Sequence, residues 1–136
     1  MSDLPKRIYL YGPSGSGKTR EAVRMAKLSN EIPYRKRCSR LWNNYRGQKV
    51  VLIDNLEKQD AKYIQNYIGD WIDYYSFEGS ITGSEKTYLE INPMDYTFII
   101  TSYIPIREMF SDYPENLKDK IYRIFEEREL KLEKEK

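Results

Sequence analysis

The stretch Gly12-Pro13-Ser14-Gly15-Ser16-Gly17-Lys18-Thr19 decides the fold of this 136-residue chain. It satisfies the pattern G-x-x-x-x-G-K-[ST] in full. A β-prone run at residues 6–11 precedes it, and residues 18–28 follow with apolar side chains at helical spacing. A strand, a glycine-rich loop and a helix in this order gather backbone N–H groups and a helix N-terminus around one phosphate. The sequence therefore predicts a nucleotide-binding loop made by all eight residues, with Lys18 on the β- and γ-phosphates and the Thr19 hydroxyl on Mg²⁺.

A second motif lies at residues 50–54, where four apolar residues run into Asp54. A continuous apolar run is typical of a strand buried on both faces of a parallel sheet. A nucleotide site of this kind needs a carboxylate at the end of a neighbouring strand, so Asp54 is predicted to hold Mg²⁺ together with Thr19. A simple turn beginning at Asp54 is the alternative. The next position often carries the acid that polarises the attacking water, but here it is Asn55, which leaves Glu57 as the nearest candidate base.

Four motifs in order carry a family resemblance. The phosphate loop is followed by residues 41–48, which read Leu-Trp-Asn-Asn-Tyr-Arg-Gly-Gln and run into the acidic strand. Residues 98–102 (Phe-Ile-Ile-Thr-Ser) and 120–124 (Lys-Ile-Tyr-Arg-Ile) follow. This order resembles the superfamily 3 helicase domain of replication-initiator (Rep) proteins of circular single-stranded DNA viruses and related plasmids. The resemblance covers residues 6–125, with Arg123 in the segment that carries the arginine finger of that family.

The resemblance implies an ATP-dependent DNA helicase or translocase that acts in replication of a small circular genome, with ATP and Mg²⁺ as cofactors. Thr101 and Ser102 would be sensor residues, and Arg123 would act on the nucleotide of a neighbouring subunit in a hexameric ring. Single-stranded DNA would be the partner, in a host nucleus for a eukaryotic virus or in the cytoplasm for a bacterial plasmid. Two residues depart from the family pattern, Asn55 and Tyr103, and both bear on the rate of hydrolysis rather than on the fold.

Two further segments are candidates for nucleic-acid contact. Residues 76–91 predict a β-hairpin in the region where these helicases insert a DNA-contacting loop, so Lys86, Thr82 and Ser84 are candidate DNA-binding residues at its tip. An ordinary surface hairpin is the alternative. The basic and aromatic residues 34–45 fit nucleic-acid binding as well, but packing of the aromatic rings beneath the sheet edge is the favoured interpretation.

Composition excludes several classes of protein. The chain has no His and one Cys, which excludes a His-dependent catalytic triad, a His general base, a Cys/His zinc site and an intramolecular disulfide. Its mean hydropathy is −0.78 and it contains no long apolar run, so neither a membrane span nor a signal peptide is expected. The net charge of +2 is close to balance, so nucleic-acid binding requires local patches. Carboxylates, Lys, Arg, backbone amides and Mg²⁺ remain for the chemistry.

The patterns together predict an α/β P-loop NTPase of the AAA+-like kind. We expect a mainly parallel sheet of about five strands, helices on both faces and a β-hairpin insertion. Residues 1–125 would form the helicase ATPase domain, with one helix over residues 60–74 and another from residue 116 to about residue 120 or beyond. Residues 126–136, which are mostly charged, would form a solvated tail. Two alternatives stay open: a small P-loop nucleotide or metabolite kinase, and a weakly hydrolysing nucleotide-dependent assembly module.

Overall fold

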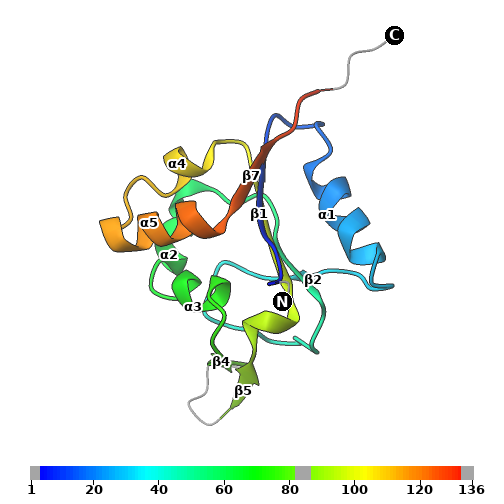
Figure 1. Cartoon of the computed structure of the whole chain (residues 1–136), viewed down its shortest axis with the longest axis vertical. Coiled ribbons are helices and arrows are strands. Elements are labelled where there is room, and N and C mark those ends of the chain that lie inside the picture. The colour runs from blue at the N-terminus through cyan, green and yellow to red at the C-terminus, as the bar shows by residue number, and fades with distance from the viewer. Residues whose placement is uncertain (1–3, 82–86, 133–136) are drawn as a thin grey trace.

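A five-stranded parallel sheet forms the centre of the protein. The computed structural model describes residues 4–81 and 87–132. The sheet has the order β2-β3-β6-β1-β7, and every pair of neighbouring strands is parallel (Figure 1). Its strands are β1 (Arg7–Tyr11), β2 (Tyr34–Arg35), β3 (Val50–Ile53), β6 (Thr97–Ser102) and β7 (Glu126–Glu129). The predicted α/β fold is confirmed.

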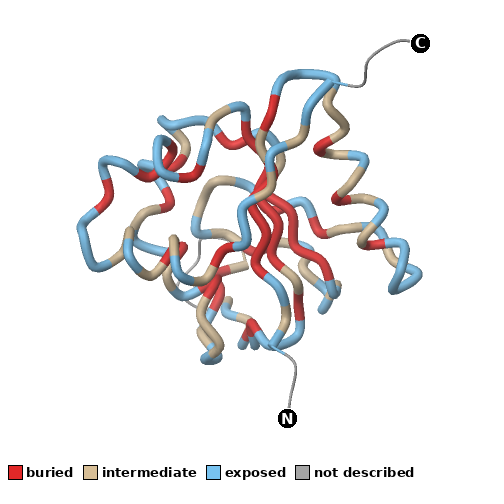
Figure 2. Tube along the Cα trace, turned by 45° about the horizontal axis from the view of Figure 1, so that its top comes forward, coloured by how far each residue is buried: buried red, intermediate tan, exposed pale blue. Residues whose placement is uncertain are grey.

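The central strands are apolar because both of their faces are covered. All four residues of β3 are buried, and so are most residues of β1 and β6, which form the red centre of Figure 2. Ile8 of β1 lies in register with Ile99 of β6, and Ile99 lies in register with Leu52 of β3. These three side chains share one face of the sheet, and burial of such a face is the main favourable contribution to folding.

Helices cover both faces of the sheet, as predicted. Helix α1 (Lys18–Lys27) lies on one face, where Ala22 and Ala26 pack against the apolar residues of β1, β3 and β6 (Figure 1). The opposite face carries the larger part of the core and four helices: α2 (Lys58–Ile64), α3 (Ile68–Ile72), α4 (Ile106–Met109) and α5 (Glu115–Ile124). None of the helices in the described part of the chain has the length and apolar character of a membrane-spanning segment.

The single helix predicted over residues 60–74 is wrong. The structure has two short helices, α2 and α3, with a turn at residues 65–67 in which the N–H of Tyr67 donates to the carbonyl of Ile64. The break keeps Ile64, Ile68 and Trp71 in the same core cluster. Those positions also fit an unbroken helix, so the apolar spacing could not reveal the turn.

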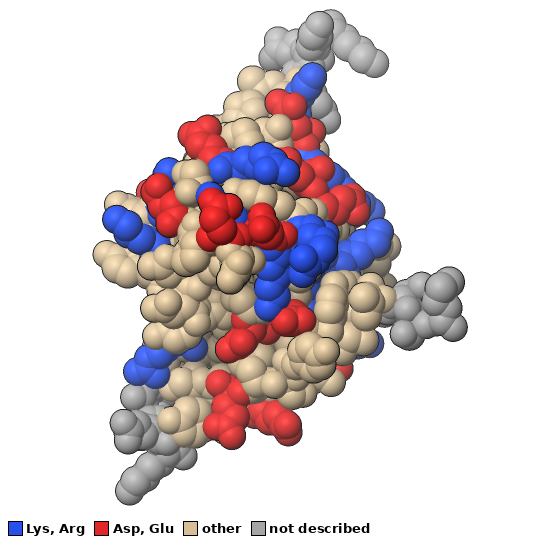
Figure 3. Space-filling model, turned by 60° about the vertical axis from the view of Figure 1, so that its left-hand side comes forward, with Lys and Arg blue, Asp and Glu red and all other residues tan. Residues whose placement is uncertain are grey.

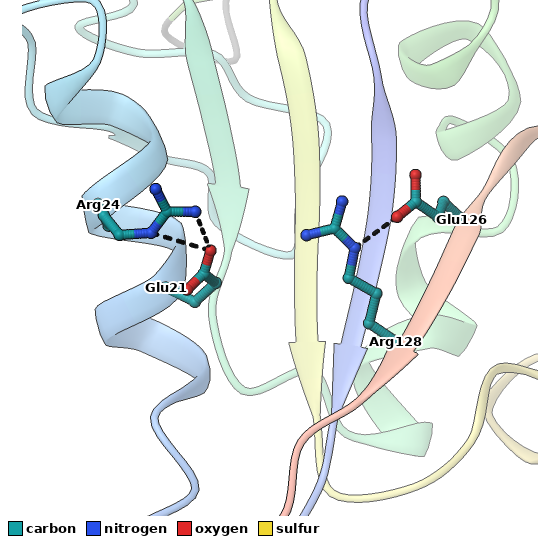
Figure 4. A network of polar contacts seen from close by, with 4 residues as sticks. All are labelled: Glu21, Arg24, Glu126 and Arg128. Atoms are coloured by element: carbon teal, nitrogen blue, oxygen red, sulfur yellow. Dashed lines mark hydrogen bonds and ion pairs between the residues drawn. The ribbon is translucent and has the colours of Figure 1, made fainter.

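The charged tail predicted to begin at residue 126 is wrong for its first four residues. Residues 126–129 form β7, an edge strand that pairs with β1 and places Glu126 opposite Ile8. Charged side chains are common on edge strands because one side of such a strand faces water. Arg128 pairs with Glu126 along the strand, while Arg24 pairs with Glu21 on α1 (Figure 4).

The predicted hairpin is confirmed in its two strands. Strand β4 (Phe77–Ser80) pairs antiparallel with β5 (Tyr88–Ile91), and a short 3₁₀ helix (Pro93–Asp95) leads back to β6. The hairpin lies beyond the end of the sheet at which β1 begins, away from the phosphate loop (Figure 1). Thr82, Ser84 and Lys86 lie outside the described residues, so their contact with DNA stays a prediction.

The aromatic residues between β2 and β3 pack inside the protein rather than facing a ligand. The Trp42 side chain is fully buried, its ring stacks on that of Tyr34 at 5.7 Å, and Tyr45 contacts both rings. Lys36 is buried beside them, and burial lowers its pKa to about 7 because an ammonium group loses hydration there. The packing interpretation of residues 34–45 is therefore confirmed for these side chains.

Arg7 fixes the start of β1 in the core. It is 2% exposed, and the rings of Tyr74 and Tyr96 lie 4.7 and 5.2 Å from its guanidinium carbon. The guanidinium donates at 2.6–3.2 Å to four main-chain carbonyls, those of Ile72, Asp73, Pro93 and Tyr96. Arg7 thus supplies donors to carbonyls at the end of α3 and at both ends of the 3₁₀ helix.

Replacing this side chain should destabilise the fold. Arg7→Met is expected to lower the free energy of unfolding by about 2–4 kcal/mol, because a similar hydrocarbon remains while buried carbonyls lose their donors. The measurement is urea denaturation. Lys6→Met, a change at the exposed neighbouring residue, is the control and should cost at most about 0.5 kcal/mol. A loss for Arg7→Met no greater than that of the control would contradict this account.

Candidate nucleotide-binding site

The phosphate loop links the carboxyl end of β1 to the first turn of α1. Gly17, the residue before the helix, has a left-handed backbone with φ of 90°, which favours glycine. Gly12 is required for a different reason: a Cβ atom there would lie 2.1 Å from the carbonyl oxygen of Leu130, just after β7. The N–H of Gly12 donates to the carbonyl of Ser102, so β6 holds the loop as well. The glycines thus permit a close turn between two neighbouring strands.

Lys18 is the first residue of α1, and its side chain points back into the phosphate loop. Its side chain is 8% exposed, and its ammonium donates to the carbonyls of Gly12 at 2.7 Å and Pro13 at 3.0 Å. The ammonium also lies 4.5 Å from the centre of the Tyr103 ring. Burial lowers the pKa of Lys18, while the nearby Asp54 carboxylate acts in the opposite direction. A cation is therefore held at the loop, where a phosphate would offer it an ionised acceptor in place of neutral carbonyls.

Asp54 receives hydrogen bonds from two hydroxyl groups. Thr19 Oγ1 from α1 and Thr101 Oγ1 from β6 each donate to Oδ1 of Asp54 at 2.8 Å. Thr101 also accepts the N–H of Asn55 at 2.7 Å. The other carboxylate oxygen, Oδ2, lies 3.2 Å from the guanidinium of Arg35 on β2. Four elements of the fold therefore meet at one carboxylate.

A cavity of about 400 Å³ opens beside this carboxylate. Its lining combines most of the phosphate loop with the ends of β3 and β6: Ser14, Gly15, Gly17, Lys18, Thr19, Arg20, Asp54, Asn55, Thr101 and Tyr103. Ser16 Oγ is buried and has no hydrogen-bond partner among the residues that the structure describes. The structure thus brings five of the eight predicted loop residues, Asp54 and Thr101 to one cavity, while Gly12, Pro13 and Ser16 do not line it.

Three predicted site residues outside the phosphate loop, among those that the structure describes, lie away from this cavity. Ser102 is 1% exposed and donates to the carbonyl of Leu56, so its hydroxyl joins two strand ends instead of facing the cavity. Glu57 is exposed and precedes α2, because the left-handed backbone of Asn55 (φ 59°) and burial of Leu56 turn the chain away. Arg123 is exposed near the end of α5, at the sheet edge where β1 begins. The described structure therefore brings neither Glu57 nor Arg123 to the cavity of its own chain.

Two residues at the site were not assigned to it by the motifs. Arg20 lines the cavity, and Arg35 forms the ion pair with Asp54. Asn55 and Tyr103, singled out as departures from the family pattern, also line the cavity. Arg20 is adjacent to the motif and could have been included on position alone. Arg35 becomes a neighbour of Asp54 only through the pairing of β2 with β3, which no local pattern reveals.

The donors present fit Mg²⁺ bound together with a nucleotide. Among the described residues no group of three or more His, Cys, Asp or Glu side chains could hold a metal ion. The hydroxyl oxygen of Thr19 and the carboxylate of Asp54 nonetheless lie 2.8 Å apart at the cavity. Mg²⁺ usually takes one or two protein oxygens and completes its shell with phosphate and water, so this pair of oxygens suffices.

Comparison with known proteins places the chain in a family. A family model described as RNA helicase matches residues 8–86, more than half of the chain, including the phosphate loop and the acidic strand. The chain belongs to the RNA helicase family. This domain is of the superfamily 3 helicase type, so the resemblance to helicases is confirmed at that level. A search of curated proteins finds no match.

Among solved structures, the chain is similar to NtrX from Brucella abortus, crystallised in complex with ADP. The two share 15% sequence identity with a TM-score of 0.63, over 93% of this chain and 32% of that one. The likeness supports the fold, that of a P-loop NTPase. The chain spans about a third of the length of this structure.

The Thr101 hydroxyl makes two hydrogen bonds at this site, one as donor and one as acceptor. Thr101→Val keeps the shape of the side chain but leaves the Asn55 N–H without its acceptor and Asp54 with one hydroxyl donor fewer. We expect the free energy of unfolding to fall by about 1–3 kcal/mol. Thr101→Ser, which keeps the hydroxyl, should retain most of this stability. Equal losses in the two variants, measured by urea denaturation, would show that the methyl group matters and the hydroxyl does not.

Proposed function

We propose that this chain is the motor domain of a helicase that hydrolyses ATP with Mg²⁺ and moves along a single strand of nucleic acid. The observation that carries the proposal is the convergence of Lys18, Thr19, Asp54 and Thr101 on one cavity at the carboxyl ends of parallel strands. Ligands of α/β proteins bind at this edge of a sheet. Membership of the RNA helicase family and the ADP bound by NtrX both support a nucleotide here.

The phosphate loop and the four converging residues would each have a part in phosphoryl transfer. The loop N–H groups and Lys18 would bind the phosphate oxygens and offset the charge that builds on them. Thr19 and Asp54 would hold Mg²⁺, which would offset negative charge on the phosphates when bound. Thr101 orients the Asp54 carboxylate through its hydroxyl. These residues position and stabilise charge, which is most of what this chemistry needs.

A weakly hydrolysing assembly module is the second candidate. The cavity presents Asn55 where an acid would polarise water, and Tyr103 lies over the Lys18 ammonium. Neither side chain can take a proton from water at neutral pH. Slow hydrolysis with strong nucleotide-dependent association would favour this reading over a motor.

The finer proposal is a Rep-type helicase that acts on single-stranded DNA during replication of a small circular genome. It rests on the order of the four motifs, whereas the family description makes RNA the competing substrate. Basic and acidic side chains lie close together on the face shown in Figure 3, so a strong field of one sign does not cover that face. Nucleic-acid contact is therefore expected to be local, and the hairpin is the segment proposed for it.

Loss of the loop cation tests the nucleotide site. Lys18→Ala should weaken ATP binding by about tenfold to a hundredfold, the range for a lost charge-assisted hydrogen bond, and should abolish turnover. Lys27→Ala, at the exposed end of the same helix, is the matched control. Calorimetry measures binding, and phosphate release is measured alone and with single-stranded DNA or RNA. The proposal predicts stimulation by one of these strands in the wild type; a wild type that binds ATP but ignores both would support the assembly module.

Variants of Arg123 test whether neighbouring subunits of an assembly share the nucleotide site. Because it lies at the sheet edge opposite the cavity, we propose that it serves the nucleotide of a neighbouring subunit, where such a charge is worth about 10³–10⁵ in rate. Arg123→Ala and Lys18→Ala should each be inactive alone. Mixed assemblies should recover part of the turnover, because some interfaces pair an intact loop with an intact arginine. Absence of recovery in a sample shown to co-assemble would refute action between subunits.

A further inference from the structure

Both oxygens of the Asp54 carboxylate have partners within the protein itself. Oδ1 accepts the hydroxyls of Thr19 and Thr101, and Oδ2 lies 3.2 Å from the guanidinium of Arg35. The Arg35 side chain is 57% exposed and that of Asp54 is 28% exposed, so the ion pair lies at the mouth of the site. The Arg35 guanidinium therefore already offsets the negative charge of the carboxylate that would bind Mg²⁺.

Arg35 and Mg²⁺ would therefore act on the same carboxylate. Two cations at one carboxylate repel each other, and a part-exposed arginine on a short edge strand can move at little cost. Strand β2 has only two residues, and the side chain of its last residue extends toward solvent between two buried neighbours, Tyr34 and Lys36. The residues on either side of Arg35 are thus buried in the protein, while its guanidinium lies at the surface.

The residue after Arg35 is anchored by an unusual set of contacts. Lys36 is 4% exposed, and its ammonium donates to three main-chain carbonyls, those of Arg37, Ser39 and Leu41, at 2.9, 2.6 and 2.8 Å. An ammonium group has three N–H donors, so all of them are used. The ammonium also lies 4.2 Å from the ring centre of Trp71 and 5.1 Å from that of Trp42. We call this arrangement of Lys36, the three carbonyls and the two indole rings the lysine cage.

The lysine cage joins the nucleotide site to the hairpin. Residues 35–42 begin at the ion pair with Asp54 and end at Trp42, whose N–H donates to the carbonyl of Ser80 on β4 at 2.8 Å. Leu41 forms a parallel bridge with the same serine. A short, continuous segment thus has one end on the metal-side carboxylate and the other on the first strand of the hairpin, with Lys36 holding its middle.

We propose that Arg35 is a positioning residue that binds Asp54 in the nucleotide-free site and leaves it when nucleotide and Mg²⁺ bind, and that residues 35–42 carry this change to the β4–β5 hairpin. The inference rests on the proposed function, since it needs a nucleotide at the cavity. Residues 35–42 would then couple nucleotide binding at the phosphate loop to the hairpin, with the Arg35–Asp54 ion pair as the contact that changes.

Tryptophan fluorescence reports on the lysine cage directly. The chain has two tryptophans, and both contact Lys36. The residues that line the described cavity include neither of them. In the wild type, ADP with Mg²⁺ should therefore change the tryptophan emission, whereas ADP with EDTA should change it far less.

Replacing Arg35 should change the Mg²⁺ requirement of ADP binding and the tryptophan emission, but not the affinity for ADP itself. Arg35→Met should lower the Mg²⁺ concentration needed for half-maximal ADP binding by about two- to fivefold, as loss of a competing, part-exposed ion pair allows. It should also remove most of the emission change, while ADP affinity in EDTA stays as in the wild type. Arg35→Lys keeps the charge and should keep the wild-type Mg²⁺ requirement. Arg37→Met is the matched control, because its side chain is exposed and Asp54 takes its ion pair from Arg35.

Lys36→Met tests the transmission step. Its Mg²⁺ requirement should match the wild type, but the nucleotide-dependent emission change should be lost. Should this variant fail to fold, the Arg35 variants still decide the question, because an exposed side chain is changed in each.

The outcomes distinguish this inference from the proposed function. If the wild type does not bind ADP with Mg²⁺, the proposed nucleotide site is wrong. If it binds ADP but Arg35→Met keeps the wild-type Mg²⁺ requirement, or if the wild-type emission does not respond, only the role of Arg35 is refuted. An equal loss of ADP affinity with and without Mg²⁺ in Arg35→Met would overturn the switch and make Arg35 a phosphate-binding residue.

Discussion

The hydrogen bonds to the Asp54 carboxylate are the interaction on which the rest of the site depends. They connect the first turn of α1, the end of β6 and the edge strand β2 to a residue at the end of β3. Side chains can meet in this way only because parallel strands bring their carboxyl ends to one edge of the sheet. The place of β6 between β1 and β3 is equally important, since it puts Thr101 within reach of the acid while β1 presents the phosphate loop. The fold and the candidate chemistry therefore share one constraint.

Two buried cations illustrate how the protein holds its irregular segments. Arg7 and Lys36 are each at most 4% exposed, and both use main-chain carbonyls as acceptors. Carbonyls in loops need donors when water is excluded, and one cationic side chain can serve three or four of them. Aromatic rings complete both environments: Tyr74 and Tyr96 around Arg7, and Trp42 and Trp71 around Lys36. Main-chain carbonyls and aromatic rings thus surround each of these two buried cations.

Features set by local chemistry could be predicted from the sequence, and features set by distant contacts could not. The phosphate loop has glycines where the backbone needs them, and β3 is a continuous apolar run. Both elements could therefore be predicted, together with Lys18, Thr19 and Asp54 at the cavity. The turn between α2 and α3 lies within a helical apolar pattern, and β7 looks like a solvated tail because an edge strand needs no apolar alternation. Arg35 reaches Asp54 through strand pairing alone, and Glu57 is carried away by one left-handed residue at Asn55.

The carbonyl of Leu130 lies against Gly12, and the Leu130 N–H donates to the carbonyl of Tyr11. The segment that follows β7 therefore borders the phosphate loop, although well over a hundred residues separate the two in the chain. During synthesis on the ribosome, which proceeds from the N-terminus, the loop is therefore made well before the segment that borders it. Until that segment has been made, one side of the loop is uncovered in the nascent chain, and it is covered only when β7 joins the edge of the sheet.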